Sequence, residues 1–113
     1  MHGGRDAAIA MAMVAPQIPI DRDVIDRLLP DLVGHDRRPS AFLVYLVILG
    51  ASADGRVALS HAELAERTGV SRRAVQDAIS LLRRRQLIEV TRRGTTETAE
   101  YRALPLRRGR TAL

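Results

Sequence analysis

Residues 60–90 read SHAELAERTGVSRRAVQDAISLLRRRQLIEV, and this stretch decides the fold. Ser60 and Glu63 have the spacing of a capping box, in which each side chain bonds the backbone N–H of the other residue. A helix is therefore predicted over residues 61–68. Gly69 is expected to end it, because glycine readily adopts the left-handed conformation found after a helix.

A second helix is predicted over residues 72–86, with Ser71 as its N-cap after a two-residue turn. Its apolar residues recur with a period of 3.6 and form one buried face; they are Val75, Ala78, Ile79 and Leu82. The opposite face carries Arg73, Gln76, Asp77, Ser80 and Arg84, with Arg72 and Arg83 at its sides. The pattern thus predicts two helices joined by a tight turn, the second with an arginine-rich outer face.

Strand signals follow the helices. Residues 88–92 and 99–103 alternate between apolar and polar side chains, and residues 93–98 form a hairpin loop between them. Upstream, residues 56–59 are a short strand candidate.

The stretch AFLVYLVIL, residues 41–49, is apolar on every side and could be a buried strand or a buried helix. A helix from Pro39 to Ala53 is favoured, because proline suits the first helical position. A helix apolar all round must be covered, either by the preceding helix or by a second subunit.

That preceding helix is predicted over residues 21–33, with Asp21 as its N-cap. Pro30 would kink or end it, so the segment is one short helix or two. Gly34 is read as its stop signal.

With these elements in place, residues 60–90 resemble the core of a winged helix-turn-helix DNA-binding domain. Sequences of this type place a small residue in the first helix, a glycine four positions on, and apolar residues six and nine beyond the glycine. The matching residues here are Ala65, Gly69, Val75 and Ala78. The resemblance spans roughly residues 39–104 and is to the domains of small bacterial and phage regulators and replication initiators. It implies a mainly α fold of three to four helices with a small antiparallel β-hairpin, the wing.

The chain is accordingly divided into four parts. These are a flexible or partner-packing arm (1–20), an N-terminal helical extension (21–36), a winged helix-turn-helix domain (37–104) and a basic tail (105–113). The arm contains an apolar stretch, but Asp6 abuts it and argues against a signal peptide.

The charge is concentrated in the second half of the chain. All 18 basic residues are arginine. Residues 1–57 hold six Arg against seven Asp, a net charge of −1, and residues 58–113 hold twelve Arg against six acidic residues, a net charge of +6. A one-sided basic balance indicates a polyanionic partner, and arginine is well suited to phosphates and guanine edges.

The resemblance implies sequence-specific binding of double-stranded DNA, most simply by a transcriptional regulator whose 71–86 helix enters the major groove. Base edges would be contacted from the start of that helix, and phosphates from its flanks, from the run Arg83–Arg85 and from the wing. The candidate DNA-binding residues are Thr68, Ser71, Arg72, Arg73, Gln76, Ser80, Arg83, Arg84, Arg92 and Arg93.

Two alternatives stay open: a plasmid or phage replication-initiator module, and a winged-helix adaptor that binds protein. Cysteine is absent, which removes disulfides and thiolate chemistry. The three histidines are scattered, so no metal, no cofactor and no enzymatic activity are expected. The chain is expected to be a cytoplasmic bacterial homodimer, nucleoid-associated when bound to DNA, with no membrane partner.

Overall fold

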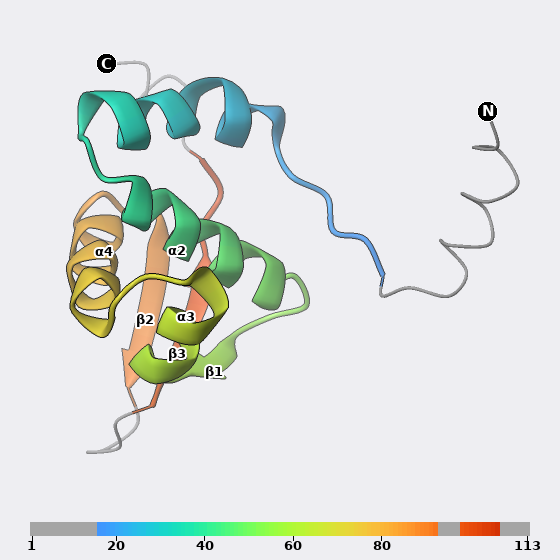
Figure 1. Ribbon diagram of the computed structural model, residues 1–113. Helices are drawn as coiled ribbons and strands as arrows, with labels where there is room; N and C mark the ends of the chain where they lie inside the picture. The colour runs from blue at the N-terminus through green and yellow to red at the C-terminus, as the bar shows by residue number, and fades with distance from the viewer. Residues whose placement is uncertain (1–15, 93–97, 107–113) are drawn as a thin grey trace, which may run out of the picture.

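The computed structural model describes residues 16–92 and 98–106. An N-terminal helical segment is followed by three α-helices and a three-stranded antiparallel sheet (Figure 1). The helices are α2 (Pro39–Ala51), α3 (His61–Thr68) and α4 (Arg72–Arg84), and the strands are β1 (Val57–Leu59), β2 (Ile88–Arg92) and β3 (Ala99–Ala103). In this arrangement α2 packs against β3, and α4 packs against β2.

Local capping explains where α3 and α4 begin. The Ser60 Oγ accepts a hydrogen bond from the Glu63 N–H at 3.0 Å, and the Glu63 carboxylate accepts one from the Ser60 N–H at 2.9 Å. Gly69 ends α3 with a φ of 82°. The Ser71 Oγ accepts from the Ala74 N–H at 3.0 Å and starts α4. The predicted capping box, glycine stop and second cap are therefore confirmed.

Two helices end earlier than predicted. α4 stops at Arg84 rather than residue 86, because Gln86 adopts a left-handed φ of 60° and turns the chain into β2. α2 begins at Pro39 as predicted but stops at Ala51, two residues short of the expected end. The choice of a helix over a strand for this apolar stretch is confirmed.

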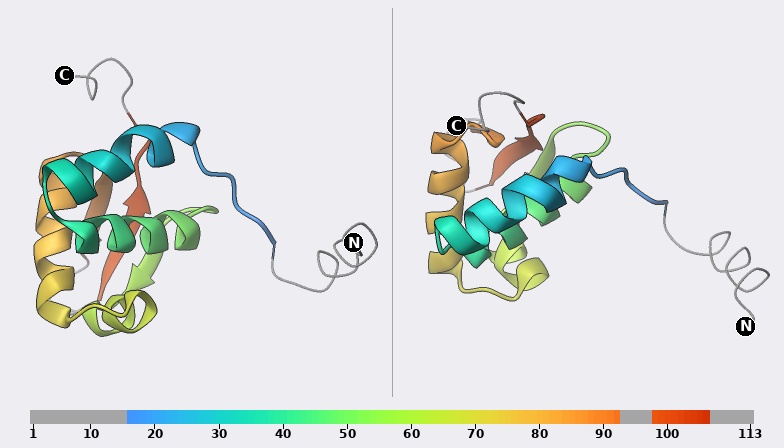
Figure 2. Two further views of the ribbon diagram at one scale, coloured as in Figure 1. Left: turned by 45° about the horizontal axis from the view of Figure 1, so that its top comes forward. Right: turned by 90° about the horizontal axis from the view of Figure 1, so that it is seen from above.

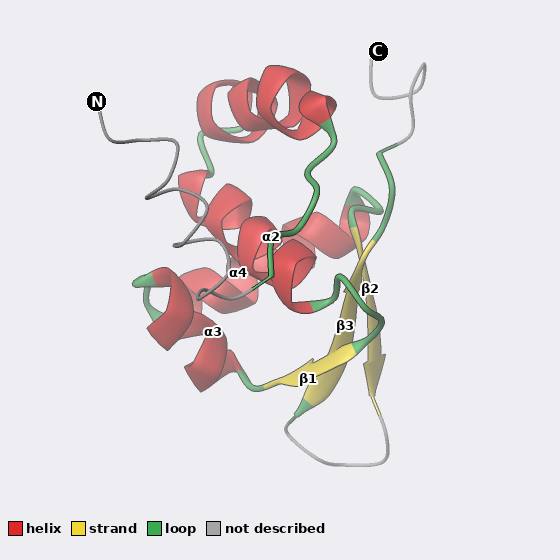
Figure 3. Ribbon diagram, turned by 90° about the vertical axis from the view of Figure 1, so that its right-hand side faces the viewer, coloured by secondary structure: helices red, strands yellow, loops and turns green. Residues whose placement is uncertain are grey.

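The sheet has the strand order β1-β3-β2 (Figure 3). Tyr101 of β3 stands opposite Val90 on one side and Val57 on the other. The two predicted hairpin strands are confirmed. The candidate strand before α3 is also present, but it begins at Val57 instead of Arg56, and it pairs with β3 as the third strand of the sheet. The tip of the hairpin loop, residues 93–97, lies outside the described residues.

The N-terminal helix, residues 22–35, consists of two π-helical segments, η1 (Val24–Leu28) and η2 (Pro30–His35), joined through Leu29. The Asp21 carboxylate accepts a hydrogen bond from the Asp23 N–H at 2.9 Å, as expected of an N-cap.

Pro30 begins the second of the two segments, in line with the prediction of one short helix or two, whereas Gly34 does not stop the helix, contrary to the prediction. In an α-helix a proline ring clashes with the carbonyl four residues earlier. The wider π turn, which bonds residues five apart, relieves that clash. The Asp36 N–H accordingly donates to the Asp31 carbonyl at 2.8 Å.

The core lies between this helix, α2, α4 and the sheet. Val24, Leu28 and Leu32, four residues apart, are buried in the same core cluster as the apolar residues of α2. Figure 2 shows the N-terminal helix lying alongside α2. Phe42, Val44, Tyr45 and Ile48 of α2 are themselves buried by the same chain, whereas Leu43 remains 41% exposed. The preceding helix therefore covers α2, which is one of the two options that the sequence left open. No helix in the described ranges is long and apolar enough to span a membrane.

Candidate nucleic-acid interface

The turn between α3 and α4 fixes the direction of α4. Leu64 of α3 and Val75 of α4 are both fully buried, and Ala78 is 4% exposed. The Gly69 N–H donates to the Ala65 carbonyl at 2.8 Å, which closes the last turn of α3. Because the buried face of α4 is locked in this way, its opposite face must point outward.

That outer face has the composition expected from the sequence. Its exposed residues are Arg72, Arg73, Gln76, Asp77, Ser80, Arg83 and Arg84. The face therefore presents four arginines, and a glutamine that can both donate and accept hydrogen bonds, to the surroundings.

The start of α4 lies close to the wing. Burial lowers the pKa of His61, and the positive charges of Arg92 and Arg72 lower it further. Burial raises the pKa of Tyr101, and the charges of Arg92 and Arg83 partly offset that rise. Arg92 at the end of β2 therefore shares its surroundings with arginines of α4. Figure 1 shows the first turn of α4, α3 and the end of β2 at the same end of the molecule.

Two hydroxyls predicted to anchor phosphates have local hydrogen bonds. The Thr68 hydroxyl donates to the Leu64 carbonyl at 2.6 Å and accepts from the Val70 N–H at 3.3 Å. The exposed Ser71 hydroxyl accepts the capping bond from Ala74. The Ser71 hydroxyl can therefore still donate its proton to an anion. The Thr68 hydroxyl would first have to break its hydrogen bond with the Leu64 carbonyl. Arg93 lies outside the described residues.

Arg85 does not belong to the outer face, which corrects the expectation that the whole run Arg83–Arg85 contacts phosphate. Its guanidinium donates to the Asp36 carboxylate at 2.6 Å and to the Asp31 carboxylate. Burial acts to raise the pKa of Asp36, but the hydrogen bond from His35 and the charge of Arg85 outweigh it and leave that pKa lowered. Arg85 thus ties the end of α4 to the N-terminal helix.

Arg37 and Arg38 are exposed cations beside α4 that the sequence reasoning did not single out. With Ala74 and Asp77 of α4, they line a cavity of about 140 Å³ at the start of α2. Their signal in the sequence was an Arg-Arg pair directly before the helix-starting Pro39.

Asp31, His35 and Asp36 are close enough to hold a metal ion. The His35 Nδ1 lies 3.2 Å from an Asp36 oxygen and 3.8 Å from an Asp31 oxygen. Arg85 occupies the other oxygens of both carboxylates, and Arg38 and Arg84 line the same cavity. These three cations oppose the binding of a further cation, so the cluster serves as the partner of Arg85.

Two helices joined by a tight turn, with the second backed by a β-hairpin, define a winged helix-turn-helix protein. Residues 38–104 match the model of the Crp-like helix-turn-helix domain. The chain belongs to that family.

Among solved structures, the chain is similar to a mutant of ZitR from Lactococcus lactis in its apo form. The two chains are 17% identical, with a TM-score of 0.43. The similarity covers 76% of this chain and 64% of ZitR, so it spans less than two thirds of that protein's length. No curated protein matches the sequence.

Proposed function

We propose that this protein is a sequence-specific double-stranded DNA-binding protein that acts as a transcriptional regulator. The observation that carries the proposal is the outer face at the start of α4, where Arg72, Arg73 and Gln76 are exposed on a helix held in place by Val75. A helix fits the major groove, where arginine pairs with guanine edges and glutamine with adenine edges.

The remaining contacts would go to the DNA backbone. Arg92 and Arg93 would extend the wing over the adjacent backbone or minor groove, and Arg37 and Arg38 would contact phosphates on the other flank of α4. The proposed contact set is Thr68, Ser71, Arg72, Arg73, Gln76, Ser80, Arg83, Arg84, Arg92 and Arg93, with Arg37 and Arg38 added.

The proposed organisation keeps residues 37–104 as the DNA-binding domain and residues 21–36 as its helical extension. The arm of residues 1–20 and the tail of residues 105–113 lie largely outside the described residues. A homodimer is proposed as the DNA-binding form, because two-fold proteins read inverted repeats with both recognition helices.

The test is a comparison of variants on DNA sites selected from a random duplex library. Arg73→Ala or Gln76→Ala is expected to weaken binding to the best site by about 1–3 kcal/mol and to relax preference at one or two base pairs. Matched controls are Arg22→Ala and Gln17→Ala, which change exposed residues of the same types away from α4. Affinity is measured by anisotropy on selected and random duplexes, with circular dichroism as a check of folding.

An unchanged ratio of specific to random binding in folded Arg73→Ala and Gln76→Ala variants would show that α4 is not the reader. Absence of duplex binding altogether would favour the protein-binding adaptor. Selected sites that map to replication origins rather than promoters would favour the initiator role.

A further inference from the structure

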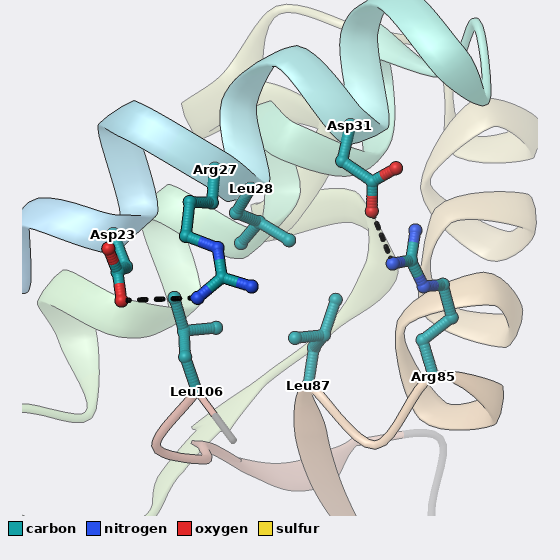
Figure 4. Close-up of a pocket in the computed structure, with 7 residues that line it drawn as sticks. All are labelled: Asp23, Arg27, Leu28, Asp31, Arg85, Leu87 and Leu106. Atoms are coloured by element: carbon teal, nitrogen blue, oxygen red, sulfur yellow. Dashed lines mark hydrogen bonds and ion pairs between the residues drawn. The ribbon is translucent and has the colours of Figure 1, made fainter. Parts of the chain in front are cut away.

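A cavity of about 500 Å³ lies on the side of the molecule where the N-terminal helix meets the junction of α4 and β2 (Figure 4). Three leucines from three parts of the chain form its apolar lining: Leu28 from the N-terminal helix, Leu87 from the junction, and Leu106 after β3. Leu28 and Leu87 are 4% and 3% exposed. The volume is in the range of small-molecule sites, which are mostly apolar with a few convergent polar groups.

Arg27 is the charged residue of the cavity whose guanidinium can bind a ligand. Its guanidinium projects from the N-terminal helix into the cavity between Asp23 and Leu106 (Figure 4). It lies 3.8 Å from the Asp23 carboxylate, which is beyond hydrogen-bonding distance. Within the described part of the chain it has no closer acceptor, so its donors can form a bidentate pair with a carboxylate.

The other charged pair that lines the cavity, Arg85 with Asp31, is already hydrogen-bonded. Arg85 donates to Asp31 inside the cavity and to Asp36 beyond it. A ligand with an anionic head beside Arg27 and an apolar body on the leucines would therefore match the free capacity of the site.

We propose that this cavity is a binding site for an organic monocarboxylate with an apolar body of medium size. Its head pairs with Arg27, and its tail covers Leu28, Leu87 and Leu106. None of the described residues that line this cavity belongs to the exposed face of α4, so the two sites are separate.

The site also has a route to α4. Arg85 follows the last residue of α4, and Leu87 precedes the first residue of β2, so the cavity wall is the joint between recognition helix and wing. A ligand tail packed on Leu87 pushes on this joint and loosens the tie that Arg85 makes between α4 and the N-terminal helix. This regulatory part, which rests on the proposed function, predicts weaker binding to duplex DNA when the cavity is filled.

The binding test uses octanoate and 4-phenylbutyrate as probes, with octan-1-ol as the uncharged match of octanoate. Methyl NMR on the full chain is expected to show shifts at Leu28, Leu87 and Leu106 at probe concentrations on the order of 1 mM. Arg27→Met is expected to weaken octanoate binding about tenfold or more and to leave octan-1-ol binding unchanged. Arg22→Met, on the exposed side of the same helix, is the control.

Failure of both acids to shift these leucines at millimolar concentration would overturn the site, as would equal octanoate binding by folded Arg27→Met and wild-type protein.

The regulatory test measures duplex affinity with and without saturating octanoate. A decrease of about fivefold or more is expected in the wild-type protein and no decrease in Arg85→Ala. An unchanged wild-type affinity would overturn the coupling. Because the NMR arm needs no DNA, a protein that binds octanoate but no duplex would contradict the proposed function and leave the site in place.

Discussion

Arg84 and Arg85 are neighbours in the sequence but face different surroundings. Each residue of an α-helix turns the side-chain direction by about 100°. Arg84 therefore joins the exposed face of α4, while Arg85 points to Asp31 and Asp36 of the N-terminal helix. The difference decides which of the two arginines is available to a phosphate.

His61 is expected to report DNA binding through its pKa. Burial and the charges of Arg92 and Arg72 lower this pKa from its usual 6.5. A histidine whose pKa is lowered by folding contributes stability that is lost as pH falls below 6.5 towards the lowered value, because the unfolded state then binds more protons. DNA phosphates placed over Arg72 and Arg92 would raise the pKa again, so DNA binding would take up a proton.

The expected result is tighter duplex binding as pH falls below 6.5, with this dependence reduced in His61→Gln. NMR titration of the His61 ring with and without duplex measures the shift directly. A His61 pKa that does not rise when saturating duplex is added would contradict the placement of phosphates near Arg72 and Arg92.

Among the elements, α3 and α4 were readable from the sequence because their signals are local. Caps, a glycine stop and a 3.6-residue period all act within a few residues of one another. The same periodicity placed the arginines of α4 on its outer face. The exposed face of α4 that forms the candidate site could therefore be predicted from the sequence.

Features that depend on distant partners were not readable in this way. The π-helical path through Pro30 accompanies the burial of Leu28 and Leu32 in the core shared with α2. Residues 56–59 were a strand candidate, but the pairing of Val57 with Tyr101 in β3 was not predicted. The partners of Arg85 lie 49 and 54 residues away in the chain. No periodicity within a segment carries such information.

The tie between α4 and the N-terminal helix is expected to stabilise the fold. Arg85→Ala removes both ion pairs and leaves two carboxylates near each other, which should lower the free energy of unfolding by about 1–2 kcal/mol given their partial exposure. Arg84→Ala, one residue earlier and exposed, should change it by less than about 0.5 kcal/mol. Urea unfolding followed by circular dichroism measures both.

The pH dependence of the same variant supplies a second check. Burial raises the pKa of Asp36, but the His35 hydrogen bond and the Arg85 charge leave it below 3.8. Such a group contributes stability above pH 3.8 that is lost as pH falls through the lowered pKa. In Arg85→Ala the pKa of Asp36 should lie closer to its ordinary value, so the variant should lose less stability than the wild type as pH falls below 3.8. Identical acid limbs in the two proteins would contradict a role for Arg85 in this tie.

For the whole molecule, the excess of arginine in the second half predicts strongly salt-dependent DNA binding. If six phosphates are neutralised, log K should fall with log salt with a slope of roughly −5. Arg92→Ala should make the slope less steep by about 0.9, and Arg22→Ala should leave it unchanged. Fluorescence anisotropy from low to moderate salt measures the slope, and a flat response would rule out a phosphate-binding surface.

The exposed apolar residues of the molecule predict how two copies assemble. Apart from Leu43, α2 is covered by its own chain, so the apolar surface left for a second copy lies mainly on the N-terminal helix. Ile25 and Val33, eight residues apart on the N-terminal helix, are 48% and 37% exposed, and Leu43 is 41% exposed. Pairing of two such helices about a two-fold axis would bury these side chains and present two α4 helices to half-sites about 34–36 Å apart.

Light scattering at tens of micromolar is therefore expected to give the mass of a dimer for the full chain. Ile25→Glu should shift the equilibrium towards monomer, because dimerisation would bury the added charge without a partner. Ala53→Glu places the same charge at an exposed alanine outside this surface and should leave the dimer intact. A wild-type chain that remains monomeric throughout this range, or an Ile25→Glu dimer as tight as the wild type, would mean that the exposed apolar residues of the N-terminal helix do not join two copies.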